Sequence, residues 1–330
     1  MSERFLVTGA LGCIGAWAVK RLVTEGVPVW TYDLPGEPQR LRLIMDDNAL
    51  SKVTMIGGDI TDDKAFGKAI ADNGITHVIH LAALQVPFVK ANPLQGVKVN
   101  VIGTAVVMET LRQNKDQIAG FAYASSAGVY GPHSMYPGGV LKHDSPLYPT
   151  HLYGVHKQAD EGMARIYDQD YDLRSIGLRP YVIYGPGRDQ GMTSTPTKAM
   201  LAAAVGRPYH ISYGGTVVFH HANDAADAFI RAARKSNSGK GAPVYNLGGT
   251  TESIASVVKF IEMAVPEMTG KITFNPQPLD AAPDADGKPL DDALGTVHWI
   301  PMAEGVKQTI DVLHAGAVAG KVNVDKILAG

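Results

Sequence analysis

Several features that would define large functional classes are scarce or missing in this 330-residue sequence. Its single cysteine, Cys13, excludes an internal disulfide framework and fits a reducing compartment. It has no run of about 18 apolar residues, so we expect no membrane-spanning helix. Its formal net charge of −2 leaves no basic field for nucleic acid or an anionic membrane. No charged-then-apolar leader precedes the first apolar run, and we therefore expect a cytoplasmic protein that binds neither nucleic acid nor membrane.

Glycine, by contrast, is abundant, and it is patterned near the start of the chain. A β-forming run at residues 5–8 leads into Gly9, Gly12 and Gly15, and a helical pattern follows over residues 16–25. A strand, a tight turn and a helix N-terminus present bare backbone N–H groups that suit a pyrophosphate. The usual dinucleotide fingerprint spaces its first two glycines by two residues rather than three, so this turn alone only suggests a cofactor. The residues expected to lie against that cofactor are Gly9, Leu11, Gly12, Cys13, Ile14 and Gly15.

Asp33 ends the second predicted strand, at residues 28–32, where a ribose-binding acid belongs in a βαβ nucleotide unit. Its carboxylate would accept hydrogen bonds from the adenosine ribose hydroxyls and repel a 2′-phosphate, which favours NAD over NADP. Alternatively, Asp33 merely starts the turn Asp-Leu-Pro-Gly. Arg40 or Arg42 could serve a 2′-phosphate if either folded back.

Strand and helix patterns alternate through the first half of the chain, which predicts right-handed crossovers and a parallel sheet. The expected fold class is α/β, a Rossmann-type doubly wound sheet with a small C-terminal α/β lobe. Leu81, Ala82 and Ala83 follow the fourth strand, at residues 76–80, and let the backbone approach the cofactor. Asp59 is expected near adenine, although it could equally be a satisfied polar residue at a strand end.

A second group of residues carries chemistry. Tyr153 and Lys157 are four apart in a helical pattern, so their side chains share one face. An ammonium beside a phenol favours the phenolate, which can exchange a proton with an alcohol or carbonyl while NAD exchanges the hydride. Ser126, at the end of the fifth strand, can hydrogen-bond the reacting oxygen. Asn100 lies inside a helix predicted over residues 96–114, where it is locally unfavourable and invites a reason.

These motifs resemble those of the extended short-chain dehydrogenase/reductases, the NAD-dependent epimerase/dehydratase family. The matching segments occur in the family's order from residue 8 to about 227. They are the Thr-Gly-x-x-Gly-x-x-Gly of residues 8–15, Gly-Asp-Ile at 58–60, His-Leu-Ala-Ala at 80–83, Asn-Val-Ile-Gly-Thr at 100–104, Ser-Ser-Ala-Gly-Val-Tyr-Gly at 125–131, Tyr153 to Lys157, Leu-Arg-Pro at 178–180, Tyr-Gly-Pro-Gly at 184–187 and, more weakly, residues 219–227.

The resemblance implies a role for each matching residue. Tyr153 is expected to be catalytic, with Lys157 also holding the nicotinamide ribose and Ser126 anchoring the substrate oxygen. Asn100 is expected near the active site, which would explain its placement in a helix. The resemblance also implies NAD as cofactor and a homodimer formed by the helices around Asn100 and Tyr153. The cofactor contacts it adds are Asp59 and Ile60 at adenine and the backbone of Pro180 to Val182 beside nicotinamide.

Departures from the family pattern bear on the substrate. Ala127 and Gly128 stand where dehydratases of the family carry an acidic pair, so sugar-nucleotide dehydration is disfavoured. Val182 and Val217 stand where nucleotide-sugar epimerases usually have an asparagine and an arginine, and a buried diphosphate without cations is costly. We therefore favour a smaller sugar, sugar acid or hydroxy-carbonyl substrate without a nucleotide handle. Arg188 could compensate, which keeps a nucleotide-sugar 4-epimerase open as an alternative.

The chain is expected to divide into an NAD-binding domain at residues 1–180 and a substrate-binding lobe at 181–330, with 206–250 returning partly to the core. The glycine-rich segment 185–196 and the proline- and aspartate-rich segment 275–290 are expected at the rim of the site. For any one residue there, an ordinary loop position is the alternative. The substrate candidates are Gln85, Ser126, His133, Arg188, Met192 and Tyr213.

No metal site is expected, although the chain has 11 histidines. His220 and His221 are adjacent on a predicted strand and therefore point to opposite faces, which does not suit one ion. Two function classes remain: an enzyme that passes hydride to NAD, as dehydrogenase or epimerase, and an NAD-binding sensor or scaffold without catalysis. The intact set of Ser126, Tyr153 and Lys157 argues against the second. The dehydrogenase and the epimerase need the same three residues, so the sequence does not separate them.

Overall fold

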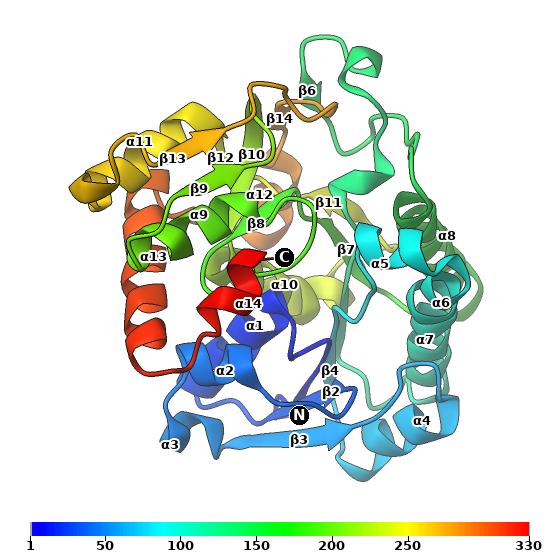
Figure 1. Cartoon of the computed structure of the whole chain (residues 1–330). Coiled ribbons are helices and arrows are strands. Elements are labelled where there is room, and N and C mark those ends of the chain that lie inside the picture. Colours follow the sequence, from blue (N-terminus) through cyan, green and yellow to red (C-terminus); the bar gives the residue numbers. More distant parts are fainter. Residues whose placement is uncertain (1, 330) are drawn as a thin grey trace.

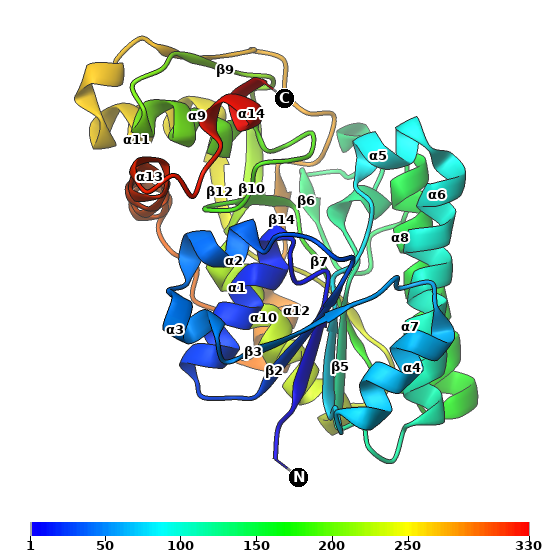
Figure 2. The same ribbon diagram turned by 60° about the horizontal axis from the view of Figure 1, so that its bottom comes forward.

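The computed structural model describes residues 2–329 and has a parallel seven-stranded sheet between two layers of helices (Figures 1 and 2). The strand order β11-β7-β5-β4-β1-β2-β3 places the first strand near the middle, with crossovers running outward on both sides. This arrangement confirms the predicted Rossmann-type doubly wound fold. The strands are β1 (Phe5–Thr8), β2 (Val29–Asp33), β3 (Val53–Gly57), β4 (His77–His80), β5 (Gly120–Ala124), β7 (Ile176–Arg179) and β11 (Val244–Asn246).

Both faces of the sheet are covered, which explains why its central strands read as unbroken apolar runs. In β1, Phe5 and Val7 pack toward one helical layer and Leu6 toward the other. Figure 2 shows the two layers on either side of the sheet. One layer holds α1 (Cys13–Thr24), α10 (Ala222–Lys235) and α12 (Lys288–Leu294), with α2 (Gln39–Ile44) and α3 (Asp47–Leu50) beside α1. The other holds α4 (Asp63–Asp72), α7 (Gly103–Gln113) and α8 (Leu152–Tyr171).

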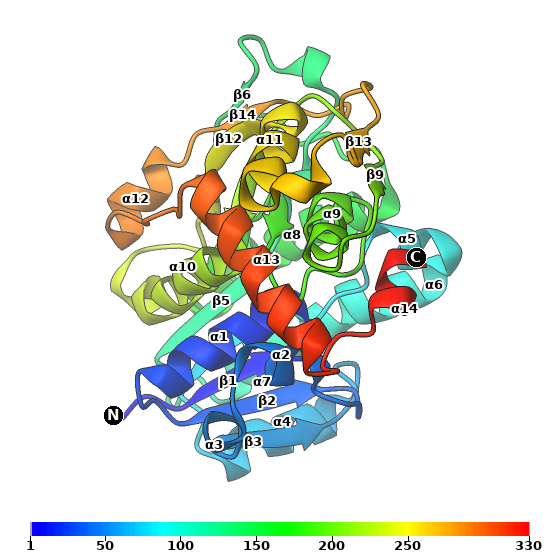
Figure 3. The ribbon, with the colours of Figure 1, turned by 60° about the vertical axis from the view of Figure 1, so that its left-hand side comes forward.

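The C-terminal half contributes to this core and also builds a second one. Its α10 packs on α1, and its β11 pairs with β7 at the edge of the main sheet. The second core lies between a three-stranded sheet and helices, of which α13 crosses the front in Figure 3. Its elements are β8 (Val182–Tyr184), β10 (Thr216–His221), β12 (Thr250–Ser253), α9 (Thr195–Ala204), α11 (Ile254–Ala264), α13 (Met302–Val318), α14 (Val324–Ala329), and the pair β9 (Tyr209–Ile211) and β13 (Ile272–Phe274).

The long connection at residues 132–149 is attached to the segment at residues 275–290. Its strand β6 (Val140–Leu141) pairs with β14 (Asp284–Ala285), and the Tyr181 hydroxyl donates to the Ala282 carbonyl. These contacts hold both segments beside the carboxyl ends of the main strands. The remaining short elements are η2 (Ala127–Val129), η3 (His133–Met135), η4 (Ser236–Ser238) and η5 (Pro266–Met268).

The single helix predicted over residues 96–114 is wrong in detail. The chain instead forms α5 (Val86–Ala91), α6 (Pro93–Val97), a π-helical turn η1 (Lys98–Ile102) and then α7. Asn100 sits in the π-helical turn, where its amide is bonded to another segment rather than to the helix. Such bulges occur frequently at functional sites.

Two element boundaries follow from the preceding segment. Strand β7 begins only at Ile176, because α8 continues to Tyr171 and ends on Asp172 in the left-handed region, at φ 56°. Helix α11 begins at Ile254, because Thr250–Ser253 pair with β10 as strand β12. Within residues 2–329, no helix combines the length and the apolar character that crossing a bilayer requires.

Candidate active site

A cavity of about 900 Å³ lies over the carboxyl ends of the main strands, where ligands of open α/β sheets bind. The structure brings most of the predicted site residues to its wall. Asn100, His133 and Tyr213 are the predicted residues that do not line it. Those that do are Gly9, Leu11, Gly12, Cys13, Ile14, Gly15, Asp33, Asp59, Ile60, Leu81, Ala82, Ala83, Gln85, Ser126, Tyr153, Lys157, Pro180, Val182, Arg188 and Met192.

The glycine turn has no room for side chains. Gly9 adopts φ +65°, and a Cβ there would lie 2.6 Å from the backbone nitrogen of Ala82. A Cβ on Gly15 would lie 2.4 Å from the carbonyl oxygen of Gly9, because the first turn of α1 rests directly on the loop. The turn therefore presents only backbone to the cavity at the N-terminus of a 12-residue helix. This arrangement fits a dinucleotide pyrophosphate.

Asp33 is fixed beside this turn. Its Oδ2 accepts the Leu11 N–H at 2.9 Å and its Oδ1 accepts the Leu34 N–H at 2.9 Å. Burial raises the pKa of this carboxyl, and the two backbone hydrogen bonds oppose that rise. Each carboxylate oxygen retains a lone pair that can accept a ribose hydroxyl.

The two arginines that could have served a 2′-phosphate are occupied. Arg40 donates to the carbonyl of Leu11 at 2.7 Å, to that of Gly187 at 2.9 Å and to the Asp189 carboxylate at 2.5 Å. Arg42 pairs with Glu37 at 2.5 Å. Both guanidinium groups are thus engaged by acceptors of the protein, and Asp33 stands where it would repel a 2′-phosphate, so the structure fits NAD better than NADP.

Tyr153 and Lys157 project from the first turns of α8. His151 caps this helix, and its Nδ1 accepts the Gly154 N–H at 2.9 Å. A Cβ on Gly154 would lie 2.1 Å from the Gly128 carbonyl oxygen, so α8 lies against the segment that follows Ser126. The structure thereby places the predicted acid/base tyrosine and the predicted serine on touching elements.

Lys157 has a partner that the sequence reasoning missed. Its Nζ lies 3.1 Å from Oδ2 of Asp160, and both side chains are buried. Burial raises the pKa of the Asp160 carboxyl to about 6, against the opposing charge of Lys157. The i,i+3 spacing on one helix was the available signal.

Ser126 lies two residues after β5, in extended conformation, and its Oγ accepts the Gly128 N–H at 3.0 Å. The adjacent Ser125 turns the other way and donates to Glu161 at 2.5 Å. Glu161 in turn accepts both arms of Arg179, each at 2.7 Å, in a buried bidentate pair. Because buried ion pairs need such complete hydrogen bonding, this network fixes the backbone at Ser126.

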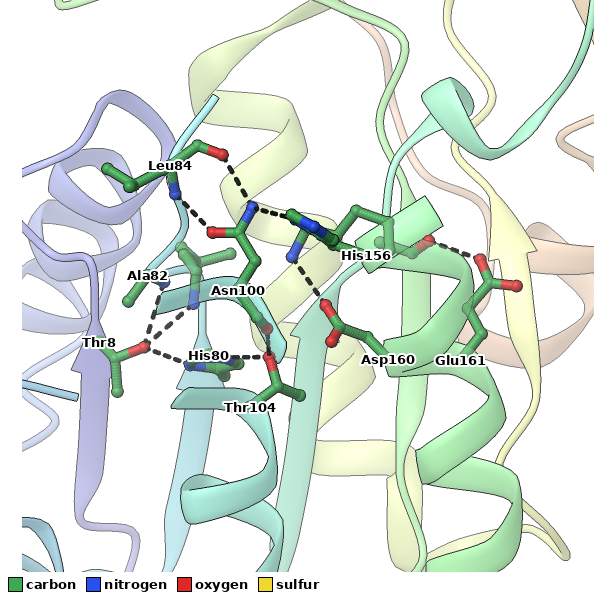
Figure 4. A network of polar contacts seen from close by, with 12 residues as sticks. Thr8, His80, Ala82, Leu84, Asn100, Thr104, His156, Asp160 and Glu161 are labelled. Atoms are coloured by element: carbon green, nitrogen blue, oxygen red, sulfur yellow. Dashed lines mark hydrogen bonds and ion pairs between the residues drawn. The ribbon is translucent and has the colours of Figure 1, made fainter. Parts of the chain in front are cut away.

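Asn100 does not line the cavity but is hydrogen-bonded to Leu84, which does. Its Oδ1 accepts the Leu84 N–H at 2.7 Å, and its Nδ2 donates to the Leu84 carbonyl at 2.9 Å, as Figure 4 shows. Below it, His80 contacts the hydroxyls of Thr8 at 2.7 Å and Thr104 at 3.1 Å. Burial lowers the pKa of His80 to about 3, so the ring is neutral. These bonds hold the segment after β4 against the glycine turn.

The other end of the cavity holds the predicted substrate residues. Gln85, Arg188 and Met192 line it, and Tyr213 is buried close to Arg188. His133 instead lies in η3, against Gly139 and outside the cavity wall. Leu279, Asp280 and Ala281, from the segment predicted as a rim, complete this end.

No metal centre is indicated within residues 2–329, where no three histidine, cysteine, aspartate or glutamate side chains are grouped to hold an ion. His220 is buried and its Nε2 accepts the Tyr181 N–H at 2.9 Å. His221 caps α10 through its Nδ1. Both histidines are used in the fold.

The sheet, the glycine turn and the tyrosine–lysine helix together define a dinucleotide-binding enzyme of the Rossmann type. The chain belongs to the NAD-dependent epimerase/dehydratase family, whose sequence profile matches residues 5–248. It is therefore an NAD-dependent enzyme of the extended short-chain dehydrogenase/reductase class, as its motifs predicted.

Individual relatives cover nearly the whole chain. The UDP-glucose 4-epimerase of Mycolicibacterium smegmatis is 28% identical over 93% of this chain and 97% of its own. The structure of UDP-N-acetylglucosamine 4-epimerase from Methanobrevibacter ruminantium superposes with a TM-score of 0.80 at 23% identity, covering 96% of this chain and 99% of that one. The NAD complex of UDP-glucose 4-epimerase from Thermus thermophilus gives 0.77 at 22% identity, covering 94% and 99%. At these identities the two structures bear on the fold alone.

Proposed function

We propose that this enzyme oxidises a secondary alcohol of a sugar or sugar-like small molecule, as an epimerase or dehydrogenase, at the end of the cavity lined by Ser126, Tyr153 and Lys157. The observation that carries the proposal is the meeting of these three side chains with the backbone-only glycine turn in one cavity. Residues 1–180 would hold NAD and 181–330 the substrate, with α10 and β11 returning to the core.

In the proposed reaction, the Tyr153 phenolate takes the proton of the substrate hydroxyl. Ser126 donates a hydrogen bond to the same oxygen and holds it in place as the carbonyl forms. Lys157 stabilises the phenolate, and Asn100 keeps the backbone of residues 81–85 against the cofactor. Bound NAD supplies the hydride acceptor.

A substrate without a nucleotide handle is supported by two apolar residues. Val182 lines the cavity and offers no side-chain hydrogen bond to a diphosphate, and Val217 is buried in the second core outside the cavity wall, where it supplies no cation. The relatives named as UDP-sugar epimerases are the reason to keep a nucleotide-sugar 4-epimerase as the alternative, with Arg188 at the diphosphate. Leaving a diphosphate short of cations in a partly buried site is unfavourable.

An epimerase must retain NAD through both hydride steps, whereas a dehydrogenase must release NADH. The hydrogen bonds of Arg40 to Leu11 and to the 187–189 segment bridge the glycine turn and the facing loop of the cavity. A bridge across the cofactor end favours retention of NAD, and therefore an epimerase.

A homodimer is supported by an apolar surface on α6, η1 and α8. Each of its side chains is 38–80% exposed. A group of exposed apolar side chains of this kind is uncommon on a surface that faces only water, and it marks an interaction site. Figure 2 shows these helices together along one side of the molecule. The residues are Leu94, Val97, Ile102, Leu152, Val155 and Ile166.

The experiment is to purify the protein, quantify NAD that remains bound, and measure NADH formation and sugar interconversion across sugars, sugar acids, polyols and UDP-sugars. Tyr153→Phe should remove at least 100-fold of the activity, in keeping with the usual size of general acid–base effects of about 10²–10⁴. Turnover that is unaffected by this substitution would rule out the proposed mechanism.

A further inference from the structure

Arg188 is a charged group with no charged partner. Within residues 2–329 no carboxylate lies at ion-pair distance from it, and its one side-chain hydrogen bond runs from Nη2 to the Thr193 hydroxyl at 3.2 Å. Its Nε is buried and has no acceptor. The next residue, Asp189, is already paired with Arg40. An anion bound at this position would supply both the missing hydrogen-bond acceptor and the missing opposite charge.

Other polar atoms beside Arg188 also lack partners. The Oε1 of Gln85 and the hydroxyl of Tyr213 are both buried without a hydrogen bond. Gln85 and Arg188 meet at Gly191, where a Cβ would lie 2.2 Å from Gln85 Oε1 and 3.1 Å from Arg188 Nη2. A half turn of the Gln85 amide would present its NH₂ group instead. Several donors therefore converge where the cavity wall carries an unpaired positive charge.

The charge balance limits what this end of the cavity can bind. The other cations in the wall are committed, Arg40 to Asp189 and Lys157 to Asp160. Asp280 adds a negative charge at the rim. One unpaired guanidinium matches one oxyanion, whereas a diphosphate would bring two charges.

We propose that Arg188, with Thr193 and Gln85 beside it, binds a single carboxylate of the substrate, so that the substrate class is sugar acids. This proposal rests on the function proposed above and narrows it. A planar carboxylate can accept both Nε–H and Nη–H of the guanidinium in a bidentate pair, which uses the buried Nε that has no acceptor. A sugar phosphate shares this chemistry, and the test below separates the two.

The test measures binding to the enzyme–NADH complex by the fluorescence of bound NADH, which requires no turnover. The probes are galacturonate and glucuronate, the neutral sugars galactose and glucose, galactose 1-phosphate, and UDP-galactose. The variants are Arg188→Gln and Arg188→Lys, with Arg207→Gln as a matched loss of a positive charge at an exposed pair with Asp325.

The uronates should bind the wild type at least 10-fold more tightly than the neutral sugars. Arg188→Gln should weaken uronate binding about 100-fold, the size expected for a charge-assisted bidentate pair. Arg188→Lys should retain only part of the wild-type uronate affinity, because a lysine cannot form the bidentate pair. Arg207→Gln should change neither uronate nor NADH binding.

Four results would overturn the proposal. Neutral sugars could bind as tightly as uronates, or uronate binding could be unchanged in Arg188→Gln. Arg188→Gln could weaken NADH binding as much as uronate binding, which would assign Arg188 to the cofactor pyrophosphate. Galactose 1-phosphate or UDP-galactose could bind more tightly than either uronate in an Arg188-dependent manner.

Failure of the hydride-transfer function gives a different pattern. If uronates bind through Arg188 but never reduce NAD or interconvert, the carboxylate site is supported and the proposed reaction is refuted. If only neutral sugars are turned over, and this activity is abolished by Tyr153→Phe and unchanged by Arg188→Gln, the reaction is supported and the carboxylate site is refuted.

Discussion

The ammonium of Lys157 lies 3.1 Å from the carboxylate of Asp160, and the two side chains are 2% and 1% exposed. The charge that Lys157 offers to Tyr153 is therefore offset by a neighbour on the same helix. Asp160 has a pKa raised to about 6 by burial, so this offset is present above pH 6 and is lost below it. We therefore expect Asp160 to be a positioning residue whose charge state bears on the proposed reaction through Lys157.

Asp160→Asn should shift the acid limb of the pH–rate profile to lower pH by about one unit, because an uncompensated ammonium favours the Tyr153 phenolate more strongly. The measurement is the rate of NADH formation or interconversion from pH 5 to 9. A merely structural role would lower the rate at every pH and leave the shape of the profile unchanged.

Two neighbours of Asp160, one on β4 and one on β5, do not titrate in this window. His80 on β4 has its pKa lowered to about 3 by burial, and Tyr123 on β5 has its pKa raised well above its usual value. Glu161 is held in its bidentate pair with Arg179. A change in the profile near pH 6 is therefore assigned to Asp160.

Asn100→Ala should destabilise the fold by about 2–4 kcal/mol, since it leaves both backbone groups of Leu84 without their buried partners. NAD affinity should fall as well, because the segment after β4 loses its anchor. Urea unfolding and NAD titration check the two effects, with Asn48→Ala, at an exposed position on α3, as control. Unchanged NAD affinity would show that Asn100 does not position this segment.

Gly15→Ala should abolish NAD binding. The added Cβ would lie 2.4 Å from the Gly9 oxygen and 2.7 Å from the Ala10 Cα, and both are backbone atoms that move only if the turn moves. Gly67→Ala in α4 is the matched control, because a Cβ there meets nothing within 4 Å. That control should gain up to about 1 kcal/mol from helix propensity. An NAD titration of Gly15→Ala with wild-type affinity would contradict the placement of the pyrophosphate.

The protein should lose stability as the pH falls from 7 to 5. Burial lowers the pKa of His80 to about 3, of His220 to about 3 and of His221 to about 4, from 6.5. Below pH 6.5 these histidines therefore bind protons in the unfolded chain but stay neutral in the folded chain. Each histidine contributes a loss of about 2 kcal/mol at pH 5. Asp160 acts in the opposite direction between pH 6 and 3.8, because its pKa is raised in the fold.

His80→Gln is the variant that isolates one of these contributions, since glutamine can still bond Thr8 and Thr104. Between pH 7 and pH 5, the free energy of unfolding measured in urea should fall by about 2 kcal/mol less in this variant than in the wild type. His143→Gln, at an exposed histidine, should match the wild type. An equal loss in all three proteins would mean that His80 takes up a proton in the folded state.

Val155→Glu should convert a dimer to a monomer in light scattering, because it buries a charge in the apolar surface of α6 and α8. Val318→Glu, at a residue 77% exposed at the end of α13, should leave the assembly unchanged. A monomeric wild type at micromolar concentration would refute the dimer.

Local patterns carried much of the fold and part of the site. The alternation of strands and helices predicted the sheet, and the spacing of Tyr153 and Lys157 placed both on one helical face, because each depends on residues close in sequence. Asp160 obeys the same helical spacing and could have been found by it. The π-helical turn at Asn100 could not be found this way, because the partner of Asn100 is the backbone of Leu84 on another segment.

The substrate end shows the limit most clearly. The meeting of Gln85 with Arg188 depends on how two loops from different halves of the chain fold over the sheet, and no periodicity encodes that. His133 was predicted to contact the substrate, but its ring lies against Gly139 instead of the cavity. The fold of its loop likewise depends on contacts that are distant in sequence.

Arg188 and Asp189 are consecutive residues with different commitments: one faces the substrate end, and the other is tied through Arg40 to the turn that receives the cofactor. Because the two residues are adjacent, the backbone that Asp189 anchors through Arg40 also carries Arg188. A change of geometry at one end of the cavity would therefore alter binding at the other, and any such coupling acts equally in both directions.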